Sequence, residues 1–253
     1  MKQSFLALCL VLALTVCAHA DQLVFVGDVD FAPYSMMQQG RPAGIDVDVM
    51  REVIHRLGLD AEIRLVPWTQ LVTMFRTGEC DGAMGVFWTP DRERRALFAM
   101  EAPIHTSDFV LFTKVGNTFS FRSYDDLKTR RIGVPKGLAI TEEFEQAEAD
   151  GVFPTREYED IAGAVRELLA GQIDAFVGNI DVTYWQLKRM GMTSSIVYLP
   201  RKVADARPAY VLLSRASGAE DKARIAAQIG QTLKAMRSDG SYNRIARNYL
   251  LRF

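Results

Sequence analysis

The sequence predicts an α/β protein of two similarly built lobes. Each lobe is an open, mostly parallel sheet flanked by helices, with a ligand cleft between the lobes. Short β-rich runs alternate with amphipathic helical patterns, and a β-α-β-α-β order occurs twice along the chain. A local motif also recurs, because GECDGAMG at 78–85 and GQIDAFVG at 171–178 show the same succession of residue types after a helical pattern. Two such matches in equivalent places favour two lobes of the same construction.

The first series places two amphipathic helices between three strands. Val49, Val53 and Leu57 lie on one face of the first helical pattern, and Gly58 and Gly78 stand where the two helices stop. The expected strands are 23–26, 62–66 and 80–86, and the expected helices are 46–57 and 68–77.

The second series repeats this order, and a tail follows it. The expected strands are 131–134, 155–158 and 173–177, and the expected helices are 139–149 and 161–170. In the tail, we expect a strand at 208–213, a helix at 219–236 and a short final helix from 239. The chain is expected to cross between lobes near 109–113 and 207–212. The first lobe is then discontinuous, with residues 21–110 and 209–253, and the second lobe has residues 111–208.

A ligand of such sheets binds outside the carboxyl ends of the strands, where loops and helix N-termini converge. In this sequence those ends are 27–34, 66–69, 85–92, 135–139 and 178–184. If the strand ends of the two lobes face each other, these segments form one cleft.

The first twenty residues are a predicted secretory signal peptide. Lys2 supplies a positive charge, an uncharged apolar run follows, and Ala18 and Ala20 provide small residues for a cleavage after Ala20. The apolar run is too short to span a bilayer. Cys17 raises the alternative of a lipidated protein, although Val16 stands where lipoprotein signals have a small residue.

The composition is that of an ordinary soluble protein and shows no basic excess. The 253 residues include 30 Lys and Arg against 31 Asp and Glu, and Lys2 leaves with the signal peptide. The mature chain is therefore slightly acidic, which argues against nucleic acid or an anionic membrane as a partner. Cys80 is the one cysteine outside the signal peptide, so we expect no internal disulfide and a buried, inert thiol.

Seven segments carry a resemblance to a known family. They read GDVDFAPYSM (27–36), GIDVDVMREV (44–53), PWTQL (67–71), GECDGAMGVFWTPDR (78–92), SYDDLKTRRIGVPKG (123–137), GQIDAFVGN (171–179) and SDGSYNRIARNYL (238–250). In this order and spacing the chain resembles the bacterial periplasmic solute-binding proteins of family 3, the amino-acid type, which deliver ligands to ABC importers. The resemblance implies the two-lobe type II periplasmic binding fold, a periplasmic location, a monomer, an ABC permease as partner and no cofactor.

In the first lobe, the resemblance assigns two aromatics and an arginine to the ligand. Phe31 and Trp68 match aromatics that cover the two sides of the ligand, although both also fit an interpretation as core aromatics. Arg92 matches an arginine that pairs with the ligand's carboxylate, and its planar fork suits a bidentate pair. Thr89 is a predicted N-cap and Pro90 a predicted first helical residue. Arg94 and Arg95, which follow, are interpreted as surface charges.

In the second lobe, Lys136, Gly137 and Leu138 precede a helix whose N–H groups form a natural anion seat. Leu138 stands where the family has a hydroxyl residue, so one side-chain donor is lost. Lys136 has two equally supported interpretations, one in the cleft and one in solvent.

Two departures from the family pattern affect the ligand. Asn179 stands where amino-acid binders have an aspartate for the ligand's ammonium, and an uncharged amide cannot balance a buried positive charge. Asp28, Asp30 or Asp181 could substitute, although each also fits an interpretation as a loop cap or a solvated carboxylate.

The other departure follows Gly85, at the end of a strand and beside the cleft. The spacing from Asp81 to Thr89 is one residue short, so Phe87 or Trp88 replaces a small hydroxyl residue. These bulky groups are expected to narrow the cleft and make it more apolar.

The leading functional hypothesis is a non-catalytic receptor that closes by a hinge motion around a small carboxylate-bearing ligand, an amino acid or related organic acid. His55 and His105 are the two histidines of the mature chain, and neither has metal-ligand spacing around it. Two alternatives stay open. One is a periplasmic enzyme on the same fold, similar to the dehydratases of cyclohexadienyl acids such as arogenate, with Asp30 or Glu101 as general acid. The other is a sensory receptor without transport.

Overall fold

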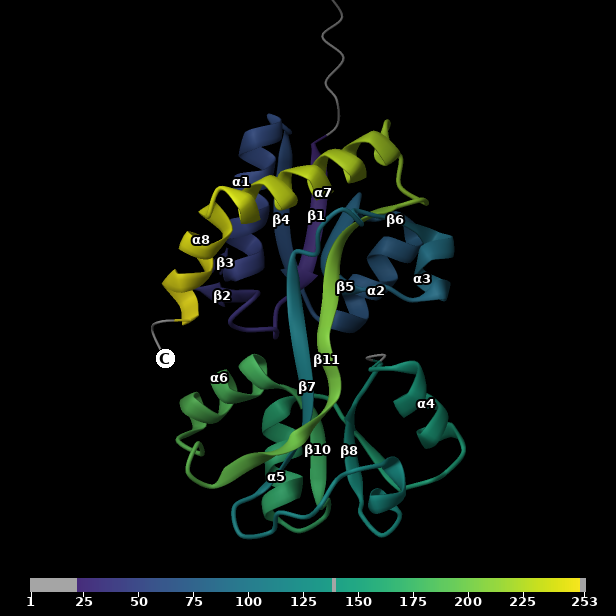
Figure 1. Cartoon of the computed structure of the whole chain (residues 1–253). Helices are drawn as coiled ribbons and strands as arrows, with labels where there is room; N and C mark the ends of the chain where they lie inside the picture. The colour runs from purple at the N-terminus through teal and green to yellow at the C-terminus, as the bar shows by residue number, and fades with distance from the viewer. Residues whose placement is uncertain (1–21, 138–139, 251–253) are drawn as a thin grey trace, which may run out of the picture.

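The computed structural model describes residues 22–137 and 140–250. The predicted signal peptide and Leu138 lie outside the described residues. Figure 1 shows two halves, one above the other, joined by two long strands. The predicted α/β architecture of two lobes is confirmed.

One nine-stranded sheet runs through both halves in the order β4-β1-β5-β11-β7-β10-β8-β9, with β6 paired to β11. Every antiparallel pairing in this sheet involves β7 or β11, and the other pairings are parallel, as predicted for each lobe. Its strands are β1 (Leu23–Asp28), β4 (Ala61–Val66), β5 (Gly82–Phe87), β6 (Ala96–Phe98), β7 (His105–Lys114), β8 (Ile132–Pro135), β9 (Thr155–Tyr158), β10 (Ala175–Asn179) and β11 (Ile196–Ser214).

Helices cover the sheet in both halves. Figure 1 shows α1, α2, α3, α7 and α8 around the upper half and α4, α5 and α6 around the lower half. The helices are α1 (Ile45–Leu57), α2 (Trp68–Thr77), α3 (Pro90–Arg95), α4 (Glu142–Ala149), α5 (Ile161–Leu169), α6 (Ile180–Met190), α7 (Lys222–Ser238) and α8 (Ser241–Leu250), with a 3-10 turn at Tyr124–Leu127. None of the helices among the described residues is long and apolar enough to cross a membrane.

The two connecting strands, β7 and β11, pair with each other along most of their length. The pairing runs from Ile196 opposite Lys114 to Ala209 opposite His105, and its register shifts three times between Tyr198 and Arg207. Such irregularities bend a strand and increase its twist. The predicted lobe boundaries, at 110/111 and 208/209, fall inside these strands and stay a prediction.

Each half has its own apolar core, which accounts for the helical patterns of the sequence. Phe25 of β1 and Met50 of α1 pack with Ile229 of α7 in the upper half. Phe144 of α4 and Ile132 of β8 pack in a separate cluster of the lower half. Separate cores are what two similar lobes require.

Several elements differ from the prediction at their ends. The predicted helices at 139–149 and 219–236 begin at Glu142 and Lys222 instead. Thr141 explains the first difference, because its hydroxyl accepts a hydrogen bond from the Phe144 N–H and so acts as the N-cap. The final helix, expected from 239, begins at Ser241.

Several further elements were not predicted, including β6 (Ala96–Phe98) and the 3-10 turn at Tyr124–Leu127. Helix α6 begins directly after Asn179, and a short hairpin joins β2 (Met36–Gln38) to β3 (Arg41–Ala43). Cys80 is buried, as predicted, and burial raises the pKa of its thiol to about 12, which fits an inert side chain.

Candidate ligand-binding cleft

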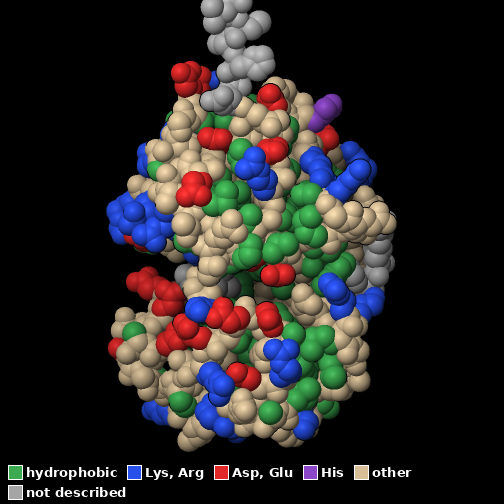
Figure 2. Space-filling model, turned by 180° about the vertical axis from the view of Figure 1, so that it is seen from behind, with side chains coloured by type: hydrophobic (Ala, Val, Ile, Leu, Met, Phe, Trp, Pro, Cys, Tyr) green, Lys and Arg blue, Asp and Glu red, His purple; other side chains and the backbone are tan. Residues whose placement is uncertain are grey.

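A cavity of about 560 Å3 lies where the two halves face each other. Figure 2 shows the hollow between the halves from behind, with acidic side chains along its edges. The upper half lines the cavity with Asp28, Asp30, Phe31, Ser35, Asp46, Trp68, Met84, Gly85 and Phe87. The lower half and β7 line it with Phe109, Pro135, Lys136, Tyr158, Glu159, Asp160, Ile161, Ala162, Asn179, Val182, Gln186, Arg189 and Met190.

Strand ends contribute to this lining, as the sequence predicts for a parallel sheet, together with loops and the helices that follow them. Asp28 ends β1, Phe87 ends β5 and Asn179 ends β10. A volume of this size suits a small molecule. The cavity therefore combines strand ends from both halves in a single site.

The lining is rich in carboxylates. Asp28, Asp30, Asp46, Glu159 and Asp160 contribute acids to it. The basic side chains in the lining are Lys136 and Arg189, and the Lys136 ammonium lies 2.6 Å from the Glu159 carboxylate. A cleft lined mainly by one sign of charge attracts the opposite sign. The cavity thus favours a positively charged group on its ligand.

Asp28 has a perturbed carboxyl group at the wall of the cavity. Burial raises its pKa to about 6, because the charged form loses water. Within this net shift, the hydrogen bond from the Asp30 N–H lowers the pKa and the Asp30 charge raises it. Asp28 therefore titrates near neutral pH, and an adjacent cation would favour its charged form.

Aromatic side chains form another part of the cavity wall in the upper half. Phe31 lies with its ring centroid 5.6 Å from that of Tyr34, and Phe87 meets Phe109 edge-on at 5.7 Å. The Trp68 indole N–H donates to the carbonyl oxygen of Gly137, 3.1 Å away in the lower half. Phe31, Trp68 and Phe87 all line the cavity, which is compatible with their predicted contact with the ligand.

A second polar contact joins the halves at the opposite side. The Tyr34 hydroxyl donates to the Asp181 carboxylate at 2.6 Å. Burial raises the pKa of Tyr34, and the neighbouring Asp181 charge raises it further, so the hydroxyl stays protonated. Asp181 is therefore engaged with Tyr34, while Asp28 and Asp30 line the cavity.

Arg92 lies behind the aromatic wall. Its guanidinium is 5.3 Å from the centre of the Trp68 ring and donates to the carbonyl oxygen of Phe87 at 2.9 Å. Thr89 accepts from the Arg92 N–H at 3.2 Å, which confirms the predicted N-cap, and Pro90 opens α3 as expected. Arg92 is not part of the cavity lining, so its contact with a ligand stays a prediction.

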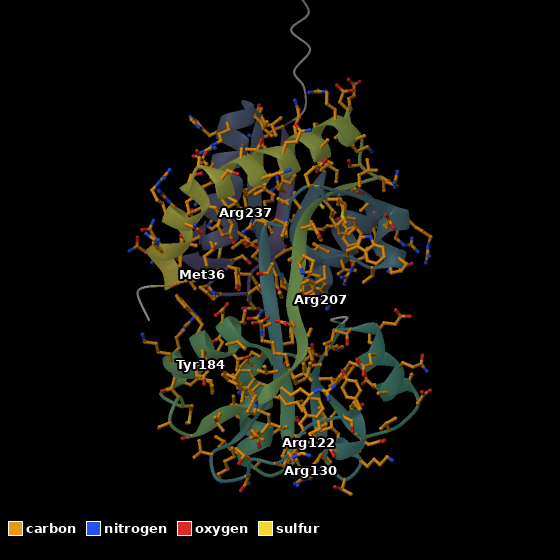
Figure 3. The ribbon with its side chains drawn as sticks, in the orientation of Figure 1. Met36, Arg122, Arg130, Tyr184, Arg207 and Arg237 are labelled. Carbon is orange, nitrogen blue, oxygen red and sulfur yellow. The ribbon has the colours of Figure 1, made fainter. Side chains whose placement is uncertain are left out.

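A further arginine lies beside Arg92. The Arg207 guanidinium is 4.1 Å from the centre of the Phe87 ring, and Figure 3 shows Arg207 on β11 between the halves. Burial lowers the pKa of Arg207, the positive charge of Arg92 acts in the same direction, and the pKa is about 10. Arg94, in contrast, is exposed and paired with Asp91, as expected for a surface charge.

The other predicted site residues divide between the cavity and its surroundings. Gly85 and Asn179 line the cavity, and Lys136 lines it while exposed and paired with Glu159. Gly137 contributes a carbonyl oxygen to Trp68 without lining the cavity. Trp88 does not line the cavity and is 39% exposed, so its contact with a ligand stays a prediction.

Asn179 has a structural role that the sequence interpretation missed. Its side-chain oxygen accepts from the Val182 N–H at 3.0 Å and caps α6, while its buried side-chain nitrogen has no hydrogen-bond partner among the described residues. The sequence also gave no sign of Asp46, Glu159 or Asp160 as lining residues. The described residues contain no group of three or more His, Cys, Asp or Glu side chains that could hold a metal ion.

The chain matches a known family along almost its whole length. The family model of "Bacterial extracellular solute-binding proteins, family 3" matches residues 23–252. Among curated proteins, the "Probable amino-acid-binding protein YxeM" of Bacillus subtilis is 24% identical over 233 residues, which cover 90% of this chain and 84% of that protein.

Solved structures share the fold at low identity. An ancestral arginine-binding protein bound to arginine superposes with a TM-score of 0.75, at 20% identity, and covers 91% of this chain and 99% of its own. A histidine kinase sensor domain gives 0.76 at 23% identity, with 91% and 96% covered. The ancestral amino-acid-binding protein AncCDT-1, a precursor of cyclohexadienyl dehydratase, gives 0.70 at 23% identity, with 90% and 94% covered. At this identity these likenesses show the fold alone.

Proposed function

Since the chain belongs to the bacterial extracellular solute-binding proteins of family 3, we propose that it is a periplasmic receptor that binds an amino-acid-like ligand and delivers it to an ABC importer. The signal peptide would direct export and be cleaved after Ala20. The observation that best supports this proposal is the cavity between the halves, which is acidic, partly aromatic and lined from both sides. A ligand that contacts both halves at once stabilises the closed arrangement, which is how such a receptor closes by a hinge.

The proposed ligand has a cationic group and a carboxylate. The acidic lining supports the cationic group, and Asp28 and Asp30 lie close enough to interact with each other. Arg92 is the proposed partner of the carboxylate, since its guanidinium lies over Trp68, which lines the cavity. A guanidinium has five N–H donors, and the carbonyl of Phe87 accepts from one of its nitrogens. We propose that closure brings the carboxylate to this group.

Under this proposal, Asn179 is compatible with an amino acid as the ligand. Its neutral amide caps α6 and leaves the lower half without the aspartate of related sites. The acids of the cavity supply negative charge elsewhere, with Asp28 and Asp160 on opposite halves. The ligand's α-ammonium is therefore proposed to interact with a lining carboxylate and not with position 179.

Thermal shift and calorimetry with three related probes test this proposal. A ligand that binds only the folded state raises the melting temperature. L-lysine is expected to bind best; L-norleucine lacks the terminal ammonium, and cadaverine lacks the carboxylate. A wider panel of amino acids and organic acids runs in parallel. The proposal fails if no amino acid in the panel shifts the melting temperature while an organic acid or amine does.

One observation favours a catalytic alternative. Burial raises the pKa of Asp28 to about 6 inside the cleft, and a general acid works best with a pKa near the working pH. The earlier candidate Glu101 does not suit this role, because it is exposed, lies against Gly230 of α7 and is not part of the cavity lining. Asp30, the other candidate, does line the cavity. Incubation with arogenate or prephenate decides the matter, since turnover would identify an enzyme and its absence leaves the receptor.

A further inference from the structure

A buried pair of ionisable side chains lies against the upper wall of the cavity. The Asp46 carboxylate, in the first turn of α1, is 2.7 Å from Nδ1 of His105, the first residue of β7. The two side chains are 2% and 1% exposed, so the pair is removed from bulk water. Asp46 nevertheless lines the cavity.

The pair presents hydrogen-bond acceptors that the protein does not use. An ionised carboxylate only accepts, so His105 Nδ1 must donate to Asp46 Oδ2, and the neutral ring then has an accepting Nε2. Asp46 Oδ1 and His105 Nε2 have no hydrogen-bond partner among the described residues. Two buried acceptors with no donor beside them suit a ligand group that donates.

Aromatic packing fixes the orientation of this pair. The His105 ring stacks on Tyr34 with centroids 4.2 Å apart and lies 5.8 Å from Phe31. Phe87 meets it edge-on at 6.5 Å. The imidazole therefore cannot turn away from Asp46 without displacing these rings, and it holds Oδ2 so that Oδ1 stays in one place.

Gly85 has no side chain to separate the cavity from the Asp46–His105 pair. This residue lines the cavity with a φ of 73°, and a Cβ at this position would lie 3.0 Å from Asp46 Oδ2 and 3.5 Å from His105 Cε1. The absent side chain leaves the pair directly beneath the backbone of β5. A larger residue here would crowd the carboxylate and close this part of the wall.

We propose that Asp46 is a ligand-binding residue that accepts a hydrogen bond from a protonated nitrogen of the ligand, an ammonium or guanidinium, and that His105 is its positioning residue. The inference rests on the proposed receptor function and adds the subsite that selects the cationic end. A buried carboxylate interacts most strongly with a charged donor. A carboxylate or phosphate at this subsite would meet acceptors and a negative charge only.

Other ionisable groups around the pair do not replace the ligand's donor. Tyr34 donates to Asp181, and Tyr242 of α8 and Arg237 of α7 lie behind the pair. The Arg237 guanidinium, labelled in Figure 3, lies over the Tyr242 ring and donates to the backbone carbonyl of Pro103. Asp28, on the same wall, titrates near pH 6 and must be controlled in any measurement against pH.

The test compares L-lysine with L-norleucine, which lacks only the terminal ammonium, by calorimetry on the full mature chain. Asp46→Asn is expected to weaken lysine binding by at least about tenfold and to leave norleucine binding within about twofold, as expected for loss of one charge-assisted contact. Glu52→Gln, on the same helix but outside the cavity lining, is the control and is expected to change lysine affinity less than about threefold. Equal losses for both probes, or equal binding of both probes to the native chain, would overturn the subsite and leave the receptor intact. Binding of neither probe would overturn the amino-acid ligand as well.

His105 is tested by a conservative rescue. In His105→Asn the amide nitrogen can still donate to Asp46, and in His105→Leu nothing can. Lysine affinity is expected to stay within about threefold in the first variant and to fall about tenfold in the second, while norleucine binding is kept in both. Equal losses of lysine affinity in the two His105 variants, or a loss in neither, would contradict the positioning role, and this comparison also serves if Asp46→Asn fails to fold.

Discussion

The two halves of the chain repeat the same strand-to-helix junction, but the side chains at the two junctions differ in charge. In the upper half β5 leads through Gly85 to the N-cap Thr89 and the start of α3, and in the lower half β10 leads through Gly178 to the N-cap Asn179 and α6. Both caps accept a backbone N–H three residues on. The repeated motif therefore encodes a capped strand-to-helix turn and not a ligand chemistry.

The glycines of the two junctions show how one local motif is used in different ways. Gly85 has a φ of 73° and leaves space beside the Asp46 carboxylate, which opens the wall of the cavity. At Gly178 a Cβ would lie 2.5 Å from the Thr183 hydroxyl oxygen and 3.2 Å from the Phe112 ring, so this glycine permits close packing of α6. The upper junction continues into the arginine Arg92, and the lower junction into a neutral amide.

The prediction with the largest expected effect concerns Arg92, the arginine of the upper junction. Arg92→Ala should weaken binding of a carboxylate ligand by about 30-fold or more, because truncation of one partner of a buried charge pair costs about 2–5 kcal/mol. The folded state should persist, since the described contacts of its guanidinium are a ring and one carbonyl. Calorimetry with L-lysine measures the loss. Arg94→Ala, on the same helix but exposed, is the control, and an affinity unchanged in Arg92→Ala would remove Arg92 from the site.

The second prediction separates the two glycines. Gly178→Ala should destabilise the fold by about 1–3 kcal/mol, because the added methyl group overpacks Thr183 and Phe112. Gly85→Ala should also lower stability, by about 1 kcal/mol for its positive φ, and should in addition weaken lysine binding. Urea unfolding and calorimetry measure the two effects. A larger loss of lysine binding in Gly178→Ala than in Gly85→Ala would contradict the different roles of the two glycines.

The third prediction uses two aspartates whose pKa values move in opposite directions. Burial raises the pKa of Asp28 to about 6, above its ordinary value of 3.8, so between about pH 4 and 6 the folded state keeps a proton that the unfolded chain has lost. Its ionisation therefore lowers stability as pH rises through this range. Asp28→Asn should stabilise the chain at pH 7.5 by on the order of 1–3 kcal/mol and have little effect below about pH 4.

Asp174 in the lower half provides the matched contrast. Burial alone would raise its pKa, but hydrogen bonds from the Arg131 side chain and backbone N–H outweigh burial and lower it. Its ionised form thus stabilises the fold above the ordinary pKa, and this contribution disappears as pH falls through the lowered pKa. Asp174→Asn should destabilise the chain at pH 7.5 and have little effect in strong acid. Unfolding curves in urea across pH would show the opposite signs, and the same sign for both variants would contradict the assignment.

The sequence predicted the features that depend on nearby residues. The alternation of strands and helices, the stops at Gly58 and Gly78, and the cap Thr89 before Pro90 all rest on patterns within a few positions, and the structure has them. Asp46 and His105 lie 59 positions apart, and no periodicity or spacing connects them. Their pairing follows from how α1 packs beside β7, which only the folded chain shows. The sequence interpretation assigns Asn179 to the ligand alone, because its position matches a family aspartate. It therefore does not predict that Asn179 caps α6.

The smallest expected effect returns to the two caps. Thr89→Ala and Asn179→Ala should each cost about 1 kcal/mol, the usual value of a lost side-chain cap. Asn179→Asp keeps an acceptor for the Val182 N–H and adds a charge at the start of α6, so it should retain stability. If position 179 also contacts an ammonium, this variant should bind L-lysine more tightly than the native chain, because a carboxylate replaces a neutral amide. Urea unfolding and calorimetry on the three variants separate the cap from the ligand contact: Asn179→Asp with native stability and native affinity would mean that the residue acts as a cap alone, and that the carboxylates elsewhere in the cavity hold the cation.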